Sequence, residues 1–299
     1  MEQVEYKKTI MRVSIVTIIW NAILSVSKVV IGFIAGAVSL VSDGFHSLSD
    51  VLSTIIVMIG AKISTKKEDK GHPFGHERFE SVSSIILALL LFDTALFLGY
   101  KGVLSIIDFA NGKRIESTGF IYVALGCAIA SIIVKFFMYL YTIINAKKIN
   151  SPSLKADGYH HLSDSLSSIA SAIGIVGLII GGNLELFDPI ASILIALFII
   201  KVAFDIFKDS INQLVDKAAP ADVENSIRDL VLTCDGVISI NSLKTRMFAN
   251  KLYVELEIVV DGNITVKEGH EIASNVHDLI EGSNQNIKHC MVHVDPSNQ

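Results

Sequence analysis

Two stretches of the chain repeat one another: residues 43–53 read DGFHSLSDVLS, and residues 157–167 read DGYHHLSDSLS. Each copy places Asp, His and Asp at positions i, i+3 and i+7, a spacing that lies on one face of an α-helix. The residues concerned are Asp43, His46 and Asp50 in the first copy and Asp157, His160 and Asp164 in the second. The repeat predicts two helices that carry the same polar face.

Both copies lie inside apolar segments. A helix needs about 20 mostly apolar residues to cross a membrane, and six segments qualify: roughly 11–34, 38–61, 79–107, 117–145, 154–181 and 187–210. The chain is 51% hydrophobic and only 18% charged, whereas soluble domains carry about 25% charged residues. We therefore expect a multi-pass α-helical membrane protein with six transmembrane helices in residues 1–212.

The distribution of basic residues predicts the orientation of these helices. Lys and Arg are enriched in cytoplasmic loops, and they gather before the first segment, after the second and after the fourth. The groups are Lys7, Lys8 and Arg12; Lys62, Lys66, Lys67 and Lys70; and Lys147, Lys148 and Lys155. We expect both termini to be cytoplasmic, in a cell (plasma or inner) membrane, with the first apolar run retained because no cleavage site follows it.

Residues 213–299 have the character of a small soluble domain. Asp222–Leu232 and Val266–Ile280 are predicted as amphipathic helices, and 237–247, 252–260 and 287–295 as strands. In the second strand, apolar and polar residues alternate. The order αββαβ predicts a sheet with helices on one face, an α+β domain.

Ionisable residues inside a membrane span are costly and usually mark an ion or proton pathway. One such triad is compatible with a structural polar patch, but two copies in two spans favour a shared site. His46, Asp50, His160 and Asp164 then supply two imidazoles and two carboxylates, a set suited to Zn²⁺. Carboxylates widen the range toward Mn²⁺ and Fe²⁺, and the set offers no thiolate for copper(I).

The repeat, the six spans and the C-terminal αββαβ domain together resemble the cation diffusion facilitator family of divalent-cation efflux transporters. The resemblance covers nearly the whole chain. It implies a homodimer that exports cytoplasmic metal, zinc in the first place, in exchange for protons, with a ferredoxin-like or metallochaperone-like cytoplasmic domain. Co²⁺, Cd²⁺, Mn²⁺ and Fe²⁺ remain alternative substrates. The expected partners are a second copy, divalent metals, protons and the lipid bilayer.

The third member of each triad has two interpretations. Asp157 is expected one helical turn inward of His160, and Asp43 one turn outward of His46. In the first interpretation, each aspartate guides the metal along a water-filled crevice without binding it directly. In the second, each aspartate caps the start of its own helix or hydrogen-bonds to it.

The loop after the second span reads KKEDKGHPFGHERFE over residues 66–80. Pro73 and Gly75 break any helix there, so a solvated turn is one interpretation. The resemblance favours a second metal site, because Asp69, His72 and His76 match the loop ligands of the family. It also matches Arg78 and Asp216 to charged positions that interlock near the membrane surface.

A third candidate site lies in the C-terminal domain. His293 and Asp295 precede Pro296 and resemble the family's cytoplasmic metal-binding ending, and His270 matches a family position near that site. Glu255 stands where the family has a histidine, but its carboxylate can still bind a metal. Asn241 stands where the family has a histidine, which weakens the case for a two-metal site. A polar strand at a dimer interface is the alternative, and Cys290 on the opposite face is expected in the core.

Other classes of function fit less well. The net charge of −5 comes without a concentrated basic face, which argues against nucleic acid. A membrane metalloenzyme would need an open metal position, whereas four protein ligands close the site. A metal sensor needs no duplicated ligand set within the membrane. Lys28, Asp93 and Lys135 also fall within the spans, and we assign them no transport role, since such residues can snorkel or pair.

Overall fold

The computed structural model describes residues 3–35, 38–112, 121–180, 186–283 and 286–297. The side chains of several residues inside these ranges, Asp43 and His46 among them, lie outside the description. The chain divides into two compact units: Tyr6–Ser210, and Ile211–Gln299 together with the first five residues. This division falls close to the expected boundary at residue 212.

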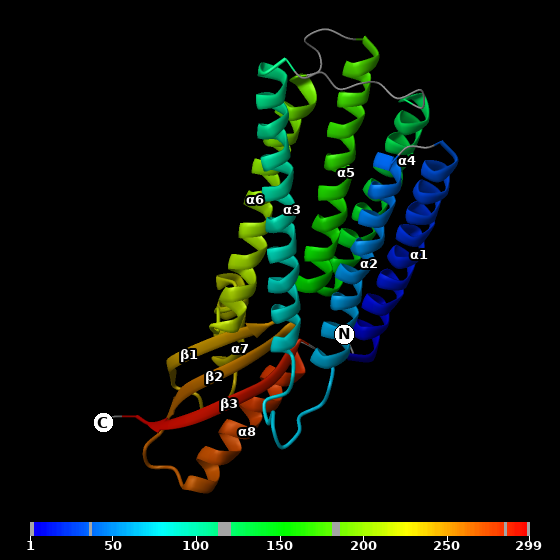
Figure 1. Cartoon of the computed structure of the whole chain (residues 1–299). Coiled ribbons are helices and arrows are strands. Elements are labelled where there is room, and N and C mark those ends of the chain that lie inside the picture. Colours follow the sequence, from blue (N-terminus) through cyan, green and yellow to red (C-terminus); the bar gives the residue numbers. More distant parts are fainter. Residues whose placement is uncertain (1–2, 36–37, 113–120, 181–185, 284–285, 298–299) are drawn as a thin grey trace. The chain divides into compact units, whose positions relative to one another are not determined.

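Six long helices make up most of the first unit within the described ranges (Figure 1). They are α1 (Gln3–Ala35), α2 (Val38–Ser64), α3 (Arg78–Ala110), α4 (Ile121–Ile149), α5 (Pro152–Ile180) and α6 (Phe187–Leu214). Each matches one of the predicted spans, usually with an extra turn at one end. The expected start of the fourth span, residues 117–120, lies outside the described residues.

Four of these helices are candidate membrane spans by length and hydropathy among the described residues: Val4–Ile31, Arg78–Ala110, Ile121–Ile149 and Pro189–Leu214. The other two, α2 and α5, are the helices that carry the repeated polar motif. With 27 and 29 residues they are each about 40 Å long at 1.5 Å per residue, which exceeds the ~30 Å hydrocarbon core. Both helices are therefore long enough to cross a membrane.

The two motif helices lie within the bundle, where α5 packs against α2, α3 and α4. Close approach of α2 and α3 depends on Gly60, where an added Cβ would lie 2.1 Å from Ser83 Oγ. The packing therefore directs the polar faces of α2 and α5 toward protein.

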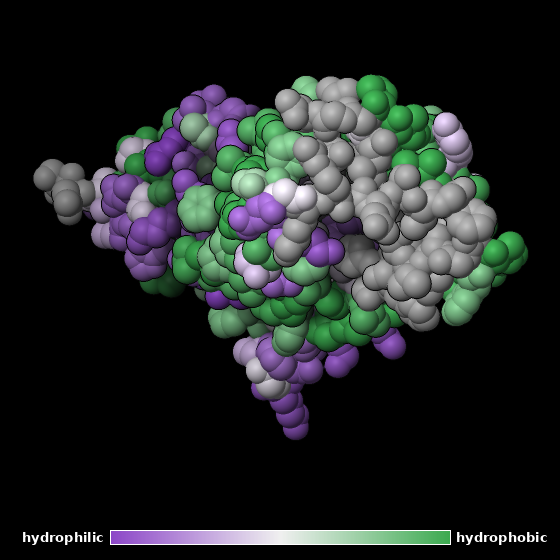
Figure 2. All heavy atoms as spheres, turned by 45° about the horizontal axis from the view of Figure 1, so that its top comes forward, coloured by the Kyte–Doolittle hydropathy of each residue, from purple (hydrophilic) through white to green (hydrophobic). Residues whose placement is uncertain are grey.

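Large apolar side chains cover the outside of the helices, and Figure 2 shows broad hydrophobic areas on the visible surface. Residues more than half exposed include Phe33, Phe97, Phe137, Leu194 and Phe204. Soluble monomers rarely expose apolar surface of this extent. The bundle thus buries many polar side chains and exposes large apolar ones, as expected of a protein embedded in lipid.

The second unit has the predicted order αββαβ: α7 (Ala221–Val231), β1 (Ser239–Phe248), β2 (Lys251–Val260), α8 (Val266–Ser283) and β3 (Ile287–Pro296). The sheet order is β1-β2-β3, with β1 antiparallel and β3 parallel to β2. Both helices cover one face, where Ile227, Val231, Val276 and Ile280 pack on the apolar side of β2 and on Cys290. The predicted α+β domain is confirmed.

Candidate metal centre

The motif helices face each other in antiparallel register. Asp50 Oδ1 in α2 lies 3.5 Å from His160 Nε2 in α5. One helical turn farther along α2, the Thr54 hydroxyl donates a hydrogen bond of 3.2 Å to Asp157 Oδ1. Because α2 runs from 50 to 54 while its partners run from 160 back to 157, the two helices are antiparallel at this level.

Three of the predicted membrane ligands come together in the interior. Asp50, His160 and Asp164 each offer one ligand atom, and these atoms lie within 4.8 Å of one another. All three are at most 8% exposed. His46 precedes Asp50 by about one turn of α2, but its side chain lies outside the described residues, so its place as a fourth ligand stays a prediction.

The structure adds Lys135 of α4 to this cluster. Its Nζ donates hydrogen bonds to Asp50 Oδ2 at 2.6 Å and to Asp164 Oδ2 at 2.7 Å. The lysine side chain is 2% exposed. Sequence reasoning missed this role, because a lone lysine in an apolar helix is compatible with snorkelling. Only the packing of α4 against α5 brings it to the carboxylates.

A second buried pair lies beside the cluster. His161 Nε2 is 3.6 Å from Asp157 Oδ2, and both side chains are completely buried. Asp157 is therefore held by Thr54 and His161 rather than exposed in a wide crevice. His161 went unnoticed in the sequence because its neighbour His160 completed the repeat. The other triad carboxylate, Asp43, lies outside the described side chains.

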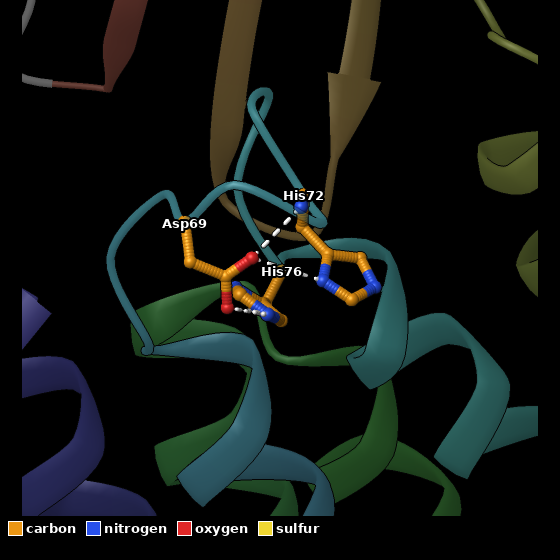
Figure 3. A group of neighbouring side chains, drawn as sticks. All are labelled: Asp69, His72 and His76. Atoms are coloured by element: carbon orange, nitrogen blue, oxygen red, sulfur yellow. Dashed lines mark hydrogen bonds and ion pairs between the residues drawn. The ribbon is translucent and has the colours of Figure 1, made fainter.

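The loop between α2 and α3 brings its three predicted ligands together (Figure 3). Asp69 Oδ2 lies 3.4 Å from His76 Nε2, and Asp69 Oδ1 lies 3.3 Å from His72 Nδ1. The two imidazole rings are 4.3 Å apart between centroids, and His76 also stacks on Phe79. His76 is buried while Asp69 and His72 are about half exposed, so a cation would reach this cluster from solvent.

Backbone hydrogen bonds fix the carboxylate of this loop cluster. The amide of His72 donates to Asp69 Oδ1 at 2.8 Å, and that of Gly71 donates to the same oxygen at 2.9 Å. The His72 amide bond, with smaller help from the His72 ring and the Gly71 amide, lowers the pKa of Asp69. The carboxylate is thus ionised at neutral pH, which is the form that binds metal.

In the C-terminal domain, His293 Nε2 lies 3.2 Å from Asp295 Oδ1. The Asn241 side-chain amide donates to the other oxygen, Asp295 Oδ2, at 2.9 Å. Asn241 therefore orients a candidate ligand instead of acting as one. His293 is 69% exposed, so this pair alone is an open surface feature.

The other two expected ligands of this domain lie elsewhere. Glu255 pairs with Arg246 at 3.1 Å on β2 and β1. His270 is on α8, which covers the opposite face of the sheet. No metal-binding group of three among the described residues includes Glu255, His270, His293 or Asp295. A site uniting these residues within one subunit stays a prediction.

Candidate metal ligands buried between the helices of an apolar bundle, together with a small α+β domain, are typical of a membrane transporter of metal cations. The comparison with known families agrees. A cation efflux transmembrane domain matches residues 14–215, and the cytoplasmic domain of cation efflux proteins matches residues 219–297. The chain belongs to the cation diffusion facilitator family.

Relatives resemble the chain over nearly its whole length. An uncharacterized transporter of Methanocaldococcus jannaschii is 40% identical, over 94% of this chain and 96% of the relative. The manganese efflux system protein MneP of Bacillus subtilis is 29% identical, over 95% of both chains. Metal tolerance protein C1 of Arabidopsis thaliana is 30% identical, over 92% of this chain and 60% of the relative.

One solved structure with similarity to the chain is a cadmium form of the MamM C-terminal domain. It is 26% identical and covers 26% of this chain and 98% of that domain, with a TM-score of 0.26.

Proposed function

We propose that this protein is a secondary transporter that exports divalent cations, Zn²⁺ foremost, from the cytoplasm in exchange for protons. The observation that carries the proposal is the gathering of Asp50, His160 and Asp164 between α2 and α5, inside the helical bundle. With His46 one turn away, a metal would meet two imidazoles and two carboxylates.

The donor set supports zinc. Imidazole nitrogen and carboxylate oxygen in a four-coordinate site are characteristic ligands of Zn²⁺. Manganese is the second candidate, because carboxylates suit Mn²⁺ and one relative is named as a manganese efflux protein. The loop cluster of Asp69, His72 and His76 would take the same metal as a structural or regulatory ion.

Proton exchange follows from the chemistry of these ligands. Carboxylates and imidazoles must lose their protons before they bind a metal, so binding releases protons. Histidine titrates near neutral pH, which makes His46 and His160 the expected exchangeable groups. Return of protons to these groups would then expel the metal.

The direction of transport and the assembly complete the proposal. By the positive-inside rule, the lysines that follow α2 and α4 support a cytoplasmic location for both termini. The soluble domain, which matches the cytoplasmic domain of cation efflux proteins, would join two copies into a homodimer.

The test is metal flux in liposomes that contain the purified protein, with Zn²⁺, Mn²⁺, Co²⁺, Cd²⁺ and Fe²⁺ offered in turn. A pH gradient is imposed at clamped membrane potential, and protein-free liposomes serve as the control. We expect zinc flux to be fastest and to fall when the gradient is removed. Faster manganese flux would make Mn²⁺ the main substrate in place of Zn²⁺. Flux that does not depend on the pH gradient would contradict proton exchange, and the absence of flux would contradict transport.

A further inference from the structure

A buried cation, Lys135, lies in the candidate transport site itself. Lys135 Nζ is 2.6 Å from Asp50 Oδ2 and 2.7 Å from Asp164 Oδ2, so its ammonium bridges a carboxylate of α2 and a carboxylate of α5. The lysine comes from α4, outside both copies of the repeat. Its positive charge is therefore paired with both motif helices at once.

A metal and this ammonium compete for the same oxygen atoms. Bonds between Zn²⁺ and a carboxylate oxygen are about 2.0–2.2 Å long. A metal bound to Asp50 Oδ2 and Asp164 Oδ2 would occupy the space that Nζ fills, or lie directly beside it. The metal ion and the ammonium are both positive, and at contact distance they repel strongly in a poorly solvated interior. A metal bound through these two oxygen atoms therefore excludes the two Lys135 salt bridges.

The helix offers the displaced ammonium another partner. Ser131 lies four residues before Lys135 on α4, hence on the same helix face, and long side chains of a helix lean toward its N-terminus. Within the described residues, the Ser131 hydroxyl is buried and makes no hydrogen bond. The four-carbon stem of lysine is flexible enough to move the ammonium over one turn.

We propose that Lys135 is a tethered counter-cation of the transport site, whose ammonium and the transported metal bind Asp50 and Asp164 in alternation. This inference rests on the proposed function. The ammonium neutralises the buried carboxylates when no metal holds them, and it lowers the affinity for metal so that the ion can leave. A purely structural salt bridge would also join the helices, but it would not oppose the metal.

Replacing the lysine by methionine tests this competition. Lys135→Met keeps the length of the side chain and removes its charge. Because a metal no longer has to break two charge-assisted hydrogen bonds, we expect its dissociation constant to fall about tenfold or more. Metal release should slow, so the maximal flux should fall as well. Zn²⁺ titration of the purified full chain in an Asp69→Ala background reads the membrane site without the loop cluster.

Lys28→Met is the matched control. Lys28 of α1 is also buried, and its Nζ donates to the Ser47 hydroxyl of α2 at 3.2 Å. Loss of this second buried cation should leave the zinc affinity unchanged. Equal tightening in both variants would overturn the proposal, because the effect would then be the loss of any buried charge. Unchanged affinity in Lys135→Met would overturn it too.

Lys135→Arg covers the case in which the methionine variant fails to fold. Arginine keeps the charge and binds carboxylates in a fork of two hydrogen bonds, so zinc should bind more weakly than to the unchanged chain. An affinity equal to or above that of the unchanged chain would contradict the competition. Flux distinguishes failure of the proposed function from failure of the role of Lys135. No zinc flux in the unchanged chain refutes the proposed function. Normal flux with unaltered zinc affinities in the lysine variants refutes only the role of Lys135.

Discussion

Asp50 in α2 and His160 in α5 lie 3.5 Å apart between Oδ1 and Nε2, although they belong to different copies of the repeated motif. The contact makes the two copies complementary: the aspartate of one helix meets the histidine of the other. A metal held here would bridge two antiparallel helices and so respond to any movement between them.

The loop cluster should bind a metal of its own. Asp69→Ala removes the carboxylate that both His72 and His76 contact, so we expect the loss of one bound zinc per subunit, counted by equilibrium dialysis and metal analysis. Glu68→Ala, a neighbouring exposed carboxylate, is the control and should keep the full count. The same count in both variants would show that the loop holds no metal.

The charges of Arg78 and Asp216 are expected to interlock near the membrane surface. Arg78→Glu should therefore lower zinc flux, and Asp216→Arg in the same chain should restore part of it. Asp216 has a left-handed backbone, with φ 62°, and asparagine tolerates this conformation well. Asp216→Asn thus isolates the charge and should impair flux by itself. Absence of rescue in the double variant would argue against the pair.

Asp157 is expected to support the site rather than to bind metal, because it is completely buried against Thr54 and His161. Asp157→Ala leaves the buried Thr54 hydroxyl without its acceptor, at a cost of about 1–3 kcal/mol, removes the carboxylate beside His161, and should lower the melting temperature in detergent. Asp157→Asn can still accept the Thr54 hydrogen bond and should melt higher than the alanine variant. If Asp157→Asn instead loses zinc affinity as fully as Asp50→Ala, Asp157 is a ligand.

The Cys290 thiol should not react with alkylating reagents in the folded protein. It is 1% exposed, and burial, with a smaller contribution from the nearby Glu281 carboxylate, raises the pKa of its thiol to about 12. Since the thiolate is the reactive and metal-binding form, Cys290 should resist iodoacetamide at pH 8 and react on unfolding. A Cys127→Ser, Cys234→Ser background leaves this thiol as the one cysteine to follow by mass spectrometry. Fast labelling of the folded chain would contradict its place in the core.

Much of the architecture could be predicted because its signals are local. The alternation of Leu252, Val254, Leu256 and Ile258 located β2 and its buried face, and the apolar runs located six helices. The i, i+4 spacing placed His46 and Asp50 on one face of one helix, and His160 and Asp164 on one face of another. The positive-inside rule predicts that both termini are cytoplasmic, so the second span runs inward and the fifth outward. The two motif helices are therefore predicted to be antiparallel.

The sequence could not supply what depends on packing between distant elements. Lys135 reaches Asp50 only because α4 packs against α5, and no spacing rule connects a lysine in one helix with carboxylates in two others. The same holds for Glu255, whose match to a ligand position gave no sign of its pairing with Arg246 across the β1–β2 ladder.

Zinc flux through liposomes that contain the Asp50→Ala variant is the decisive measurement for a transport site between α2 and α5. Asp50 contacts both His160 and Lys135, so its loss removes one candidate ligand and breaks these contacts of α2 with α5 and α4. With the variant verified as folded, with the oligomeric state of the unchanged chain and inserted as efficiently, we predict that zinc flux falls to the level of protein-free liposomes. Flux near that of the unchanged chain would contradict a transport site between α2 and α5.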